Sequence, residues 1–141
     1  MSIIGIFLPG RAVRLTRPVI MWRIPAGFPS PAEDYVEGRI DLNRDLIKHP
    51  LATFYIRVEG DSMEPTIRAG ALLIVDRMAE TKDDDIVVAR LGDEFLVKRL
   101  HLESDGSIWL QSENTAYPPI QILESVDFEV WGKVTHSIQH H

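Results

Sequence analysis

The sequence predicts an all-β fold, in which an extended N-terminal arm and short helical segments precede a β body. Three observations favour this class. Short runs rich in Val, Ile, Leu and aromatic residues follow one another from residue 51 onward, with Gly, Asp and Asn between them. No helical pattern separates these runs, as it would in an α/β protein. Apolar residues make up 45% of the 141 residues, which suffices for the core of one globular domain.

Residues 1–31 are predicted to run as an extended arm, because they contain five of the nine prolines. Proline has no backbone N–H and biases the residue before it toward extended geometry. The arm is also basic: residues 1–26 hold four arginines and no acid, whereas the rest of the chain holds 11 basic and 21 acidic side chains. Opposite charge predicts that the arm lies on the acidic body. An acidic body also argues against nonspecific nucleic-acid binding, which requires clustered cations.

A helical connector is predicted over residues 32–50, with one short helix over 32–37 and a second over 42–49. An Asp or Asn near its start can cap the second helix, and Pro50 ends it.

The β body is predicted over residues 51–141. Its expected strands cover residues 54–58, 71–76, 85–91, 94–102, 107–112 and 128–138. A tight hairpin at Gly92 and Asp93 is expected to join the third of these strands to the fourth, since glycine adopts a positive φ at little cost.

Composition excludes several classes of site. The chain has no cysteine, and therefore no disulfide, thiolate nucleophile or zinc–thiolate centre. The apolar run 3–9 is interrupted by Gly5 and Pro9 and is followed, not preceded, by arginines, so it does not read as an export signal. No stretch approaches the ~20 apolar residues that cross a bilayer. A soluble cytoplasmic protein without membrane contact, cofactor or metal is expected, with the acidic run 83–85 as a solvated turn.

Ser62 is the candidate nucleophile. It follows a predicted strand that ends at Gly60, and Pro65 favours a single helical turn directly after it. This placement presents the hydroxyl at the mouth of the turn and frees the backbone N–H groups of Ser62 and Met63 to bind an oxyanion. Serine is also a favoured N-cap, so the alternative is that Ser62 only caps the turn, and for Ser62 taken alone capping is the more common role.

Lys98 is the candidate base. The five histidines have no acidic partner that the sequence identifies, so a Ser-His-Asp triad has no positive support. Among the four lysines, Lys98 differs because strand alternation places it on one face with Leu96, Leu100 and Leu102. Burial disfavours the ammonium and lowers a lysine pKa from about 10.4, so a neutral amine can take the proton from Ser62. The alternative is a lysine that extends its ammonium to solvent.

Three segments in combination resemble the LexA/UmuD family of self-cleaving serine peptidases (peptidase family S24). These segments are residues 60–70, 72–76 and 95–100. Residues 26–32, 34–37 and 39–43 are similar, more narrowly, to the UmuD-type SOS mutagenesis branch, and the whole resemblance spans residues 26–136. It implies a twisted all-β catalytic body, a homodimer, Ser62 as nucleophile and Lys98 as general base of a serine endopeptidase.

The resemblance also implies a substrate and partners. The bond cut is the chain's own Ala26–Gly27, a RecA filament on single-stranded DNA stimulates the cut, and the trimmed form joins a Y-family DNA polymerase subunit of the UmuC type. About 50 proline-rich residues before the body are too few for a helix-turn-helix domain, so sequence-specific DNA binding is not expected. The alternatives are a non-catalytic polymerase-regulatory binding subunit and a truncated phage repressor or antirepressor domain.

Overall fold

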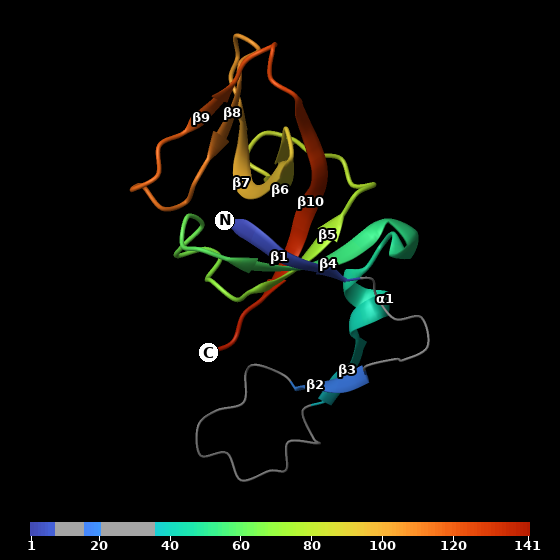
Figure 1. Ribbon diagram of the computed structural model, residues 1–141. Helices are drawn as coiled ribbons and strands as arrows, with labels where there is room; N and C mark the ends of the chain where they lie inside the picture. The colour runs from blue at the N-terminus through green and yellow to red at the C-terminus, as the bar shows by residue number, and fades with distance from the viewer. Residues whose placement is uncertain (8–15, 21–35) are drawn as a thin grey trace. The chain divides into compact units, whose positions relative to one another are not determined.

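The structure is a computed structural model that describes residues 1–7, 16–20 and 36–141 (Figure 1). These residues fall into two compact units, one with residues 1–7 and 51–141 and the other with residues 16–20 and 36–50. The predicted boundary of the arm at residue 31 and the predicted cleavage site Ala26–Gly27 lie outside the described residues. Those two assignments therefore stay predictions.

The smaller unit contains two antiparallel strands, β2 (Thr16–Ile20) and β3 (Val36–Asp41), followed by the helix α1 (Leu42–Leu46). The helix predicted over 32–37 is wrong for residues 36 and 37, which begin β3. Val36 and Ile40 are β-branched and Gly38 is a poor helix former, so this segment pairs as a strand. The predicted helix over 42–49 forms only as far as Leu46.

The larger unit is an antiparallel sheet of eight strands, in the order β1-β4-β5-β10-β6-β7-β8-β9. The strands are β1 (Ser2–Phe7), β4 (Thr53–Glu59), β5 (Leu72–Asp76), β6 (Ile86–Leu91), β7 (Glu94–Leu102), β8 (Ile108–Gln111), β9 (Ile120–Ile122) and β10 (Phe128–Ile138). A 3-10 turn, η2 (Pro50–Ala52), precedes β4. The all-β class is confirmed. None of the helices in the described ranges is long and apolar enough to span a membrane.

Strand β1 closes this sheet on itself. It pairs with β4 along its length, and its first residue pairs with Leu96 of β7. The backbone N–H of Val97 also donates to the carbonyl of Met1 at 3.1 Å. Strands β1, β4, β5, β10, β6 and β7 thus form a ring, from which β8 and β9 continue beyond β7 (Figure 1). The start of the chain lies where the ring closes.

Two hydrophobic clusters lie on opposite faces of β6 and β7. Because side chains alternate along a strand, Val88 and Val97 point into one cluster, while Val87 and Leu100 point into the other. The larger cluster contains the buried residues Met1, Ile56, Val58, Met63, Ile67, Ala71, Leu73, Val75, Val88 and Val97. The smaller contains Val87, Ala89, Leu100 and Leu110. Hydrophobic packing on both faces therefore holds β6 and β7 firmly in the sheet.

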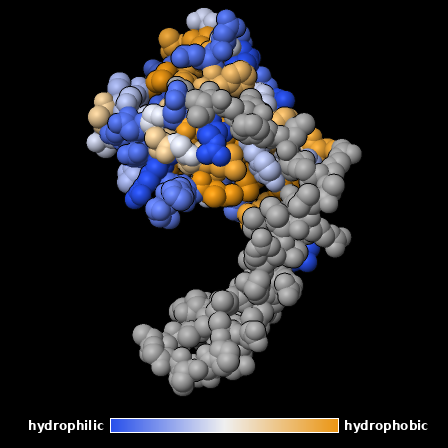
Figure 2. Space-filling view, turned by 60° about the horizontal axis from the view of Figure 1, so that its bottom comes forward, coloured by the Kyte–Doolittle hydropathy of each residue, from blue (hydrophilic) through white to orange (hydrophobic). Residues whose placement is uncertain are grey.

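Figure 2 shows one face of the molecule, where an area of hydrophobic residues is bordered by hydrophilic ones. Within the described residues, the large apolar side chains that are most exposed come from several loops and strand ends. They include Leu51, Met78, Leu123 and Ile138. Exposed apolar residues spaced along a chain in this way are ordinary for a protein surface.

Candidate active site

Ser62 lies in a tight turn that follows β4. Gly60 begins the turn with a φ of +88°, a left-handed conformation that glycine adopts without strain. A hydrogen bond from the Ile67 N–H to the Met63 carbonyl at 2.8 Å closes the turn, and the Glu64–Pro65 peptide is cis. Residues 61–67 thus form turns and not the single helical turn that was expected from Pro65. The Met63 side chain is fully buried in the larger cluster, and Ser62 itself is only 3% exposed. Core packing therefore holds the serine in place.

The backbone N–H groups of Ser62 and Met63 have no hydrogen-bond acceptor among the described residues, whereas the next N–H, of Glu64, donates to the Asp61 carbonyl at 3.1 Å. Two adjacent unpaired N–H groups beside a serine hydroxyl suit the stabilisation of a developing oxyanion. Their position follows from the turn, which directs the first N–H groups away from its own carbonyls.

The α-amine of Met1 contacts Ser62 directly. It donates a hydrogen bond to Ser62 Oγ at 2.6 Å in a buried position. Burial, followed by the positive charge of Lys98, lowers the pKa of this amine from 8.0 to about 6. This contact joins two residues that are 61 positions apart in the sequence. No local pattern indicates it, because it results from the pairing of β1 with β4 and β7.

Lys98 lies on β7 and is 6% exposed. Burial lowers the pKa of its ammonium, which is the direction that a general base requires. The amine donates a hydrogen bond to Ser112 Oγ at 2.6 Å and lies 5.6 Å from the centre of the Tyr117 ring. Within the part of the chain that the structure describes, no carboxylate forms an ion pair with it. Leu102, expected on the same apolar face, is 40% exposed instead, because it ends the strand.

One loop, residues 112–117, connects the serine turn to the lysine. The Asn114 N–H donates to the Ser62 carbonyl at 2.9 Å, and its side-chain amide donates to the Asp61 carbonyl at 3.2 Å. The Tyr117 hydroxyl donates to the Asp61 carboxylate, while its ring faces Lys98. These loop residues carried no signal in the sequence, since their partners in the serine turn are more than 50 residues away.

The predicted site residues are therefore gathered, but not in direct contact. The Met1 amine is hydrogen-bonded to Ser62, and the charge of Lys98 helps to lower the pKa of that amine, so Lys98 is close enough for its charge to act there. Among the described residues, the hydrogen-bond partner of Lys98 is Ser112 and that of Ser62 Oγ is Met1. The pairing of Ser62 with Lys98 as a catalytic dyad stays a prediction.

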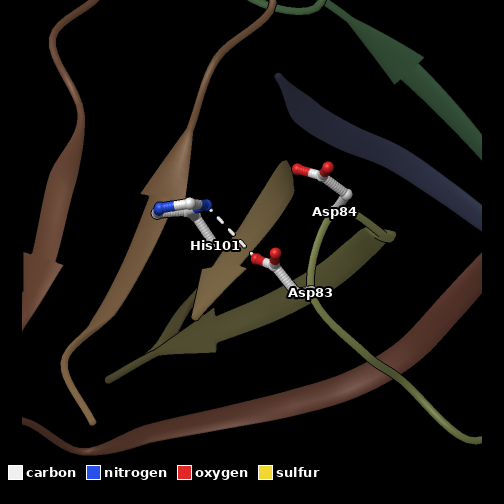
Figure 3. Close-up of side chains that lie close together, drawn as sticks. All are labelled: Asp83, Asp84 and His101. Atoms are coloured by element: carbon white, nitrogen blue, oxygen red, sulfur yellow. Dashed lines mark ion pairs between the residues drawn. The ribbon is translucent and has the colours of Figure 1, made fainter. Parts of the chain in front are cut away.

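A second polar cluster lies elsewhere on the body. Asp83, Asp84 and His101 bring their potential ligand atoms within 4.8 Å of one another (Figure 3). Both ring nitrogens of His101 already face carboxylates, Nδ1 at 3.2 Å from Asp83 and Nε2 at 2.8 Å from Glu103. The hydrogen bond to Glu103 is the main cause that raises the pKa of His101. These contacts describe an ion-paired surface cluster, and the solvated turn expected at 83–85 stays a prediction.

The α-amine of Met1 is expected to titrate near pH 6 in the folded protein, against 8.0 when it is exposed. Between pH 6 and pH 8, the amine is protonated when it is free in solvent but neutral when it is docked on Ser62. Docking of Met1 on Ser62 therefore strengthens as the pH rises from 6 to 8 and is weakest below 6. Competitive labelling of amines as a function of pH measures this pKa.

The control for that titration is the same labelling in concentrated guanidinium chloride, where the α-amine should return to its ordinary pKa. A midpoint near 8 in the folded protein would contradict the buried contact with Ser62.

Comparisons with known proteins bear on the family. The model of the family described as Peptidase S24-like matches residues 18–135. Protein SamA of Salmonella typhimurium is 44% identical over 124 residues, which cover 87% of this chain and 85% of SamA. Protein MucA of Escherichia coli is 40% identical over 126 residues, 88% of this chain and 85% of MucA. The LexA repressor of Geotalea uraniireducens is 41% identical over 133 residues, 93% of this chain and 65% of the repressor.

The resemblance stated from the sequence, to LexA-like peptidases of the UmuD type, is thereby confirmed. The match covers residues of both units. It includes Ser62, Lys98 and the loop at residues 112–117. The chain belongs to the Peptidase S24-like family.

Proposed function

We propose that the chain is a serine peptidase that cuts its own Ala26–Gly27 bond, with Ser62 as nucleophile and Lys98 as general base. The observation that carries the proposal is a buried serine with two unpaired N–H groups, together with a buried lysine of lowered pKa whose charge acts on the amine that is hydrogen-bonded to that serine. Membership of a peptidase family supports the reaction class. The absence of cysteine leaves serine chemistry as the consistent choice.

The reaction follows from these groups. The neutral amine of Lys98 takes the proton of Ser62 Oγ, and the oxygen attacks the carbonyl carbon of Ala26. The N–H groups of Ser62 and Met63 stabilise the negative oxygen that develops. As the C–N bond breaks, the Lys98 ammonium returns the proton to the amine of Gly27. Water then hydrolyses the ester between Ala26 and Ser62.

Two conditions control this reaction in the proposal. The Met1 amine has to release Ser62 Oγ before that oxygen can attack, because the hydrogen bond now directs it to Met1. The segment that contains Ala26 must then enter the site. Because the scissile bond and the site belong to the same chain, the local concentration of that bond is high. The rate is therefore limited by docking of the segment in the site and not by diffusional encounter. The basic charge of residues 1–26 and the acidic charge of the remainder favour such docking.

The cellular role proposed is a switch of the SOS response in the cytoplasm. A RecA filament on single-stranded DNA stimulates the cut, and the trimmed homodimer serves as accessory subunit of an error-prone Y-family polymerase. The similarity of the chain to SamA, MucA and the LexA repressor supports this proposed role in the SOS response. Sequence-specific contact with DNA forms no part of the proposal.

One observation favours a second function, that of a non-catalytic polymerase-regulatory subunit. Ser62 and Lys98 each have a hydrogen-bond partner other than one another, Met1 and Ser112. If those partners were permanent, Ser62 would only stabilise the turn and the closure of the sheet. Self-cleavage separates the two functions.

Incubation of the purified protein at mildly alkaline pH tests the peptidase. Mass spectrometry should find residues 1–26 and a fragment that begins at Gly27. A Gly27→Val variant should be cleaved at least about 10-fold more slowly, because a β-branched residue restricts the backbone next to the scissile bond and a small misplacement of reacting atoms is costly.

The matched control is Ala12→Val, which adds a β-branched residue to the same predicted arm away from the bond and should leave the rate unchanged. An intact chain, even with a RecA filament on single-stranded DNA present, would favour the non-catalytic subunit.

A further inference from the structure

Ser112 directly follows β8 and contacts Lys98. We propose that Ser112 is a positioning residue, whose hydroxyl holds the amine of Lys98 in the orientation that proton transfer requires. The inference rests on the proposed function of Lys98 as general base and adds to it. Its starting observation is the hydrogen bond from Lys98 Nζ to Ser112 Oγ, 2.6 Å long.

The register of β7 and β8 places the two residues opposite one another. Arg99 pairs with Gln111 at the end of β8, so the next position along each strand brings Lys98 against Ser112. Directly opposed side chains of antiparallel strands have Cβ atoms about 4.5–5.5 Å apart. The short side chain of Ser112 and the long side chain of Lys98 therefore start close together, and the Lys98 side chain folds back so that its Nζ reaches the Ser112 hydroxyl.

Packing holds both residues on the same face. Leu100 and Leu110 form a cross-strand pair two residues along from Lys98 and Ser112, and both leucines are buried in the smaller cluster. Arg99 pairs with Glu113 and so holds the outgoing loop against β7. The hydroxyl of Ser112 is thus fixed by a rigid strand pair.

The same loop fixes Ser112 relative to Ser62. Two residues after Ser112, the Asn114 N–H donates to the Ser62 carbonyl at 2.9 Å, and the Asn114 amide donates to the Asp61 carbonyl. Through the three residues from Ser112 to Asn114, the acceptor for Lys98 is therefore connected to the turn that carries the proposed nucleophile. A lysine anchored on this loop keeps a defined position with respect to Ser62.

A hydroxyl is suited to this task for a chemical reason. The lysine side chain has four rotatable methylene groups, and its amine needs an anchor in order to approach one oxygen repeatedly. A carboxylate anchor would stabilise the ammonium strongly and raise the pKa of Lys98. A neutral hydroxyl accepts a hydrogen bond from either protonation state and opposes the lowered pKa only weakly. Ser112 thus orients the base without keeping it protonated.

Replacement of Ser112 tests the proposal through the rate of self-cleavage from neutral to strongly alkaline pH. Ser112→Ala is expected to lower the limiting alkaline rate about 10- to 100-fold, the cost of a small misplacement of a catalytic group. It should also move the midpoint of the pH profile to lower pH, because the ammonium of Lys98 loses an acceptor. Ser112→Thr retains the hydroxyl and should restore most of the rate.

Two further variants separate positioning from folding. Ser112→Cys keeps nearly the volume of serine but replaces the hydroxyl by a weak acceptor, so its rate should also fall while its melting temperature stays close to the parent's. Thr115→Ala removes an exposed hydroxyl from the same loop and should change neither rate nor midpoint.

Three results would overturn the inference, and each is distinct. A normal rate and midpoint in Ser112→Ala, with Lys98→Ala inactive, would reject the positioning role and leave the proposed function intact. An inactive Ser112→Ala beside an active Ser62→Ala would make Ser112 the nucleophile. Full activity of Lys98→Ala would remove the proposed function itself, and the positioning role with it.

Discussion

Replacing Ser62 by alanine or Lys98 by methionine is expected to lower the rate of self-cleavage at least about 10³-fold, the scale seen when a nucleophile or its base is removed. Ser62→Ala removes the attacking oxygen. Lys98→Met removes the amine but keeps an unbranched apolar chain in a site where the lysine is 6% exposed. Both variants should therefore fold, and the fragment beginning at Gly27 should not accumulate.

The pH dependence of the parent protein gives the same test a second readout. Only the neutral amine of Lys98 accepts a proton, so the rate should rise with pH and level off above the pKa of that amine. Burial lowers this pKa, so the midpoint should lie below the ordinary lysine value of about 10.4. Mass spectrometry of samples quenched over time measures the rate at each pH.

The matched control is Lys82→Met, which removes an exposed lysine and should cleave like the parent. A normal rate in Lys98→Met would show that another group is the base. If chemical blocking of the Met1 amine then stopped the reaction, that amine, which is bonded to Ser62 Oγ at 2.6 Å, would be the base in place of Lys98.

Leu110→Ala is expected to lower the free energy of unfolding by about 2–5 kcal/mol, the range for truncation of a buried leucine. Leu110 has no exposed surface and packs with Val87, Ala89 and Leu100 in the smaller cluster. The loss of this side chain leaves a cavity among these residues, and the cost depends on how far the partly buried neighbours Ile108, Ile122 and Phe128 move into it. Urea denaturation followed by circular dichroism measures the change.

The control for this change is Leu123→Ala, a leucine that is 56% exposed near the same end of the sheet. It should change the free energy of unfolding by less than about 0.5 kcal/mol. If the two substitutions lowered the free energy of unfolding equally, the burial of the Leu110 side chain in the smaller cluster would be contradicted.

Local patterns predicted much of the β body. The strands over 94–102 and 128–138 have the bounds expected from the sequence, and the turn at Gly92 joins β6 to β7 as expected. These elements are specified by neighbours in the sequence: alternating apolar residues and a glycine with a φ of +57°. Hairpins of this kind need no distant partner to be recognised.

Elements that depend on distant pairing were missed or misassigned. Strand β1 was expected to be part of the extended arm, although it pairs with β4 some 50 residues later. Strand β9 has only three residues and follows two prolines, so it resembled a loop. Strand β3 was taken in part for a helix. In each case the hydrogen-bond partner lies on another segment, and no short window of sequence contains it.

The sequence by itself determined the all-β class, the turn at Ser62 and the one lysine placed among leucines on a strand. These features depend on residues that are adjacent or alternate along the chain. Only the tertiary structure decided what surrounds them. It brought the Met1 amine to Ser62 and the Ser112 hydroxyl to Lys98, because closure of the sheet by β1 and the register of β7 with β8 set those distances.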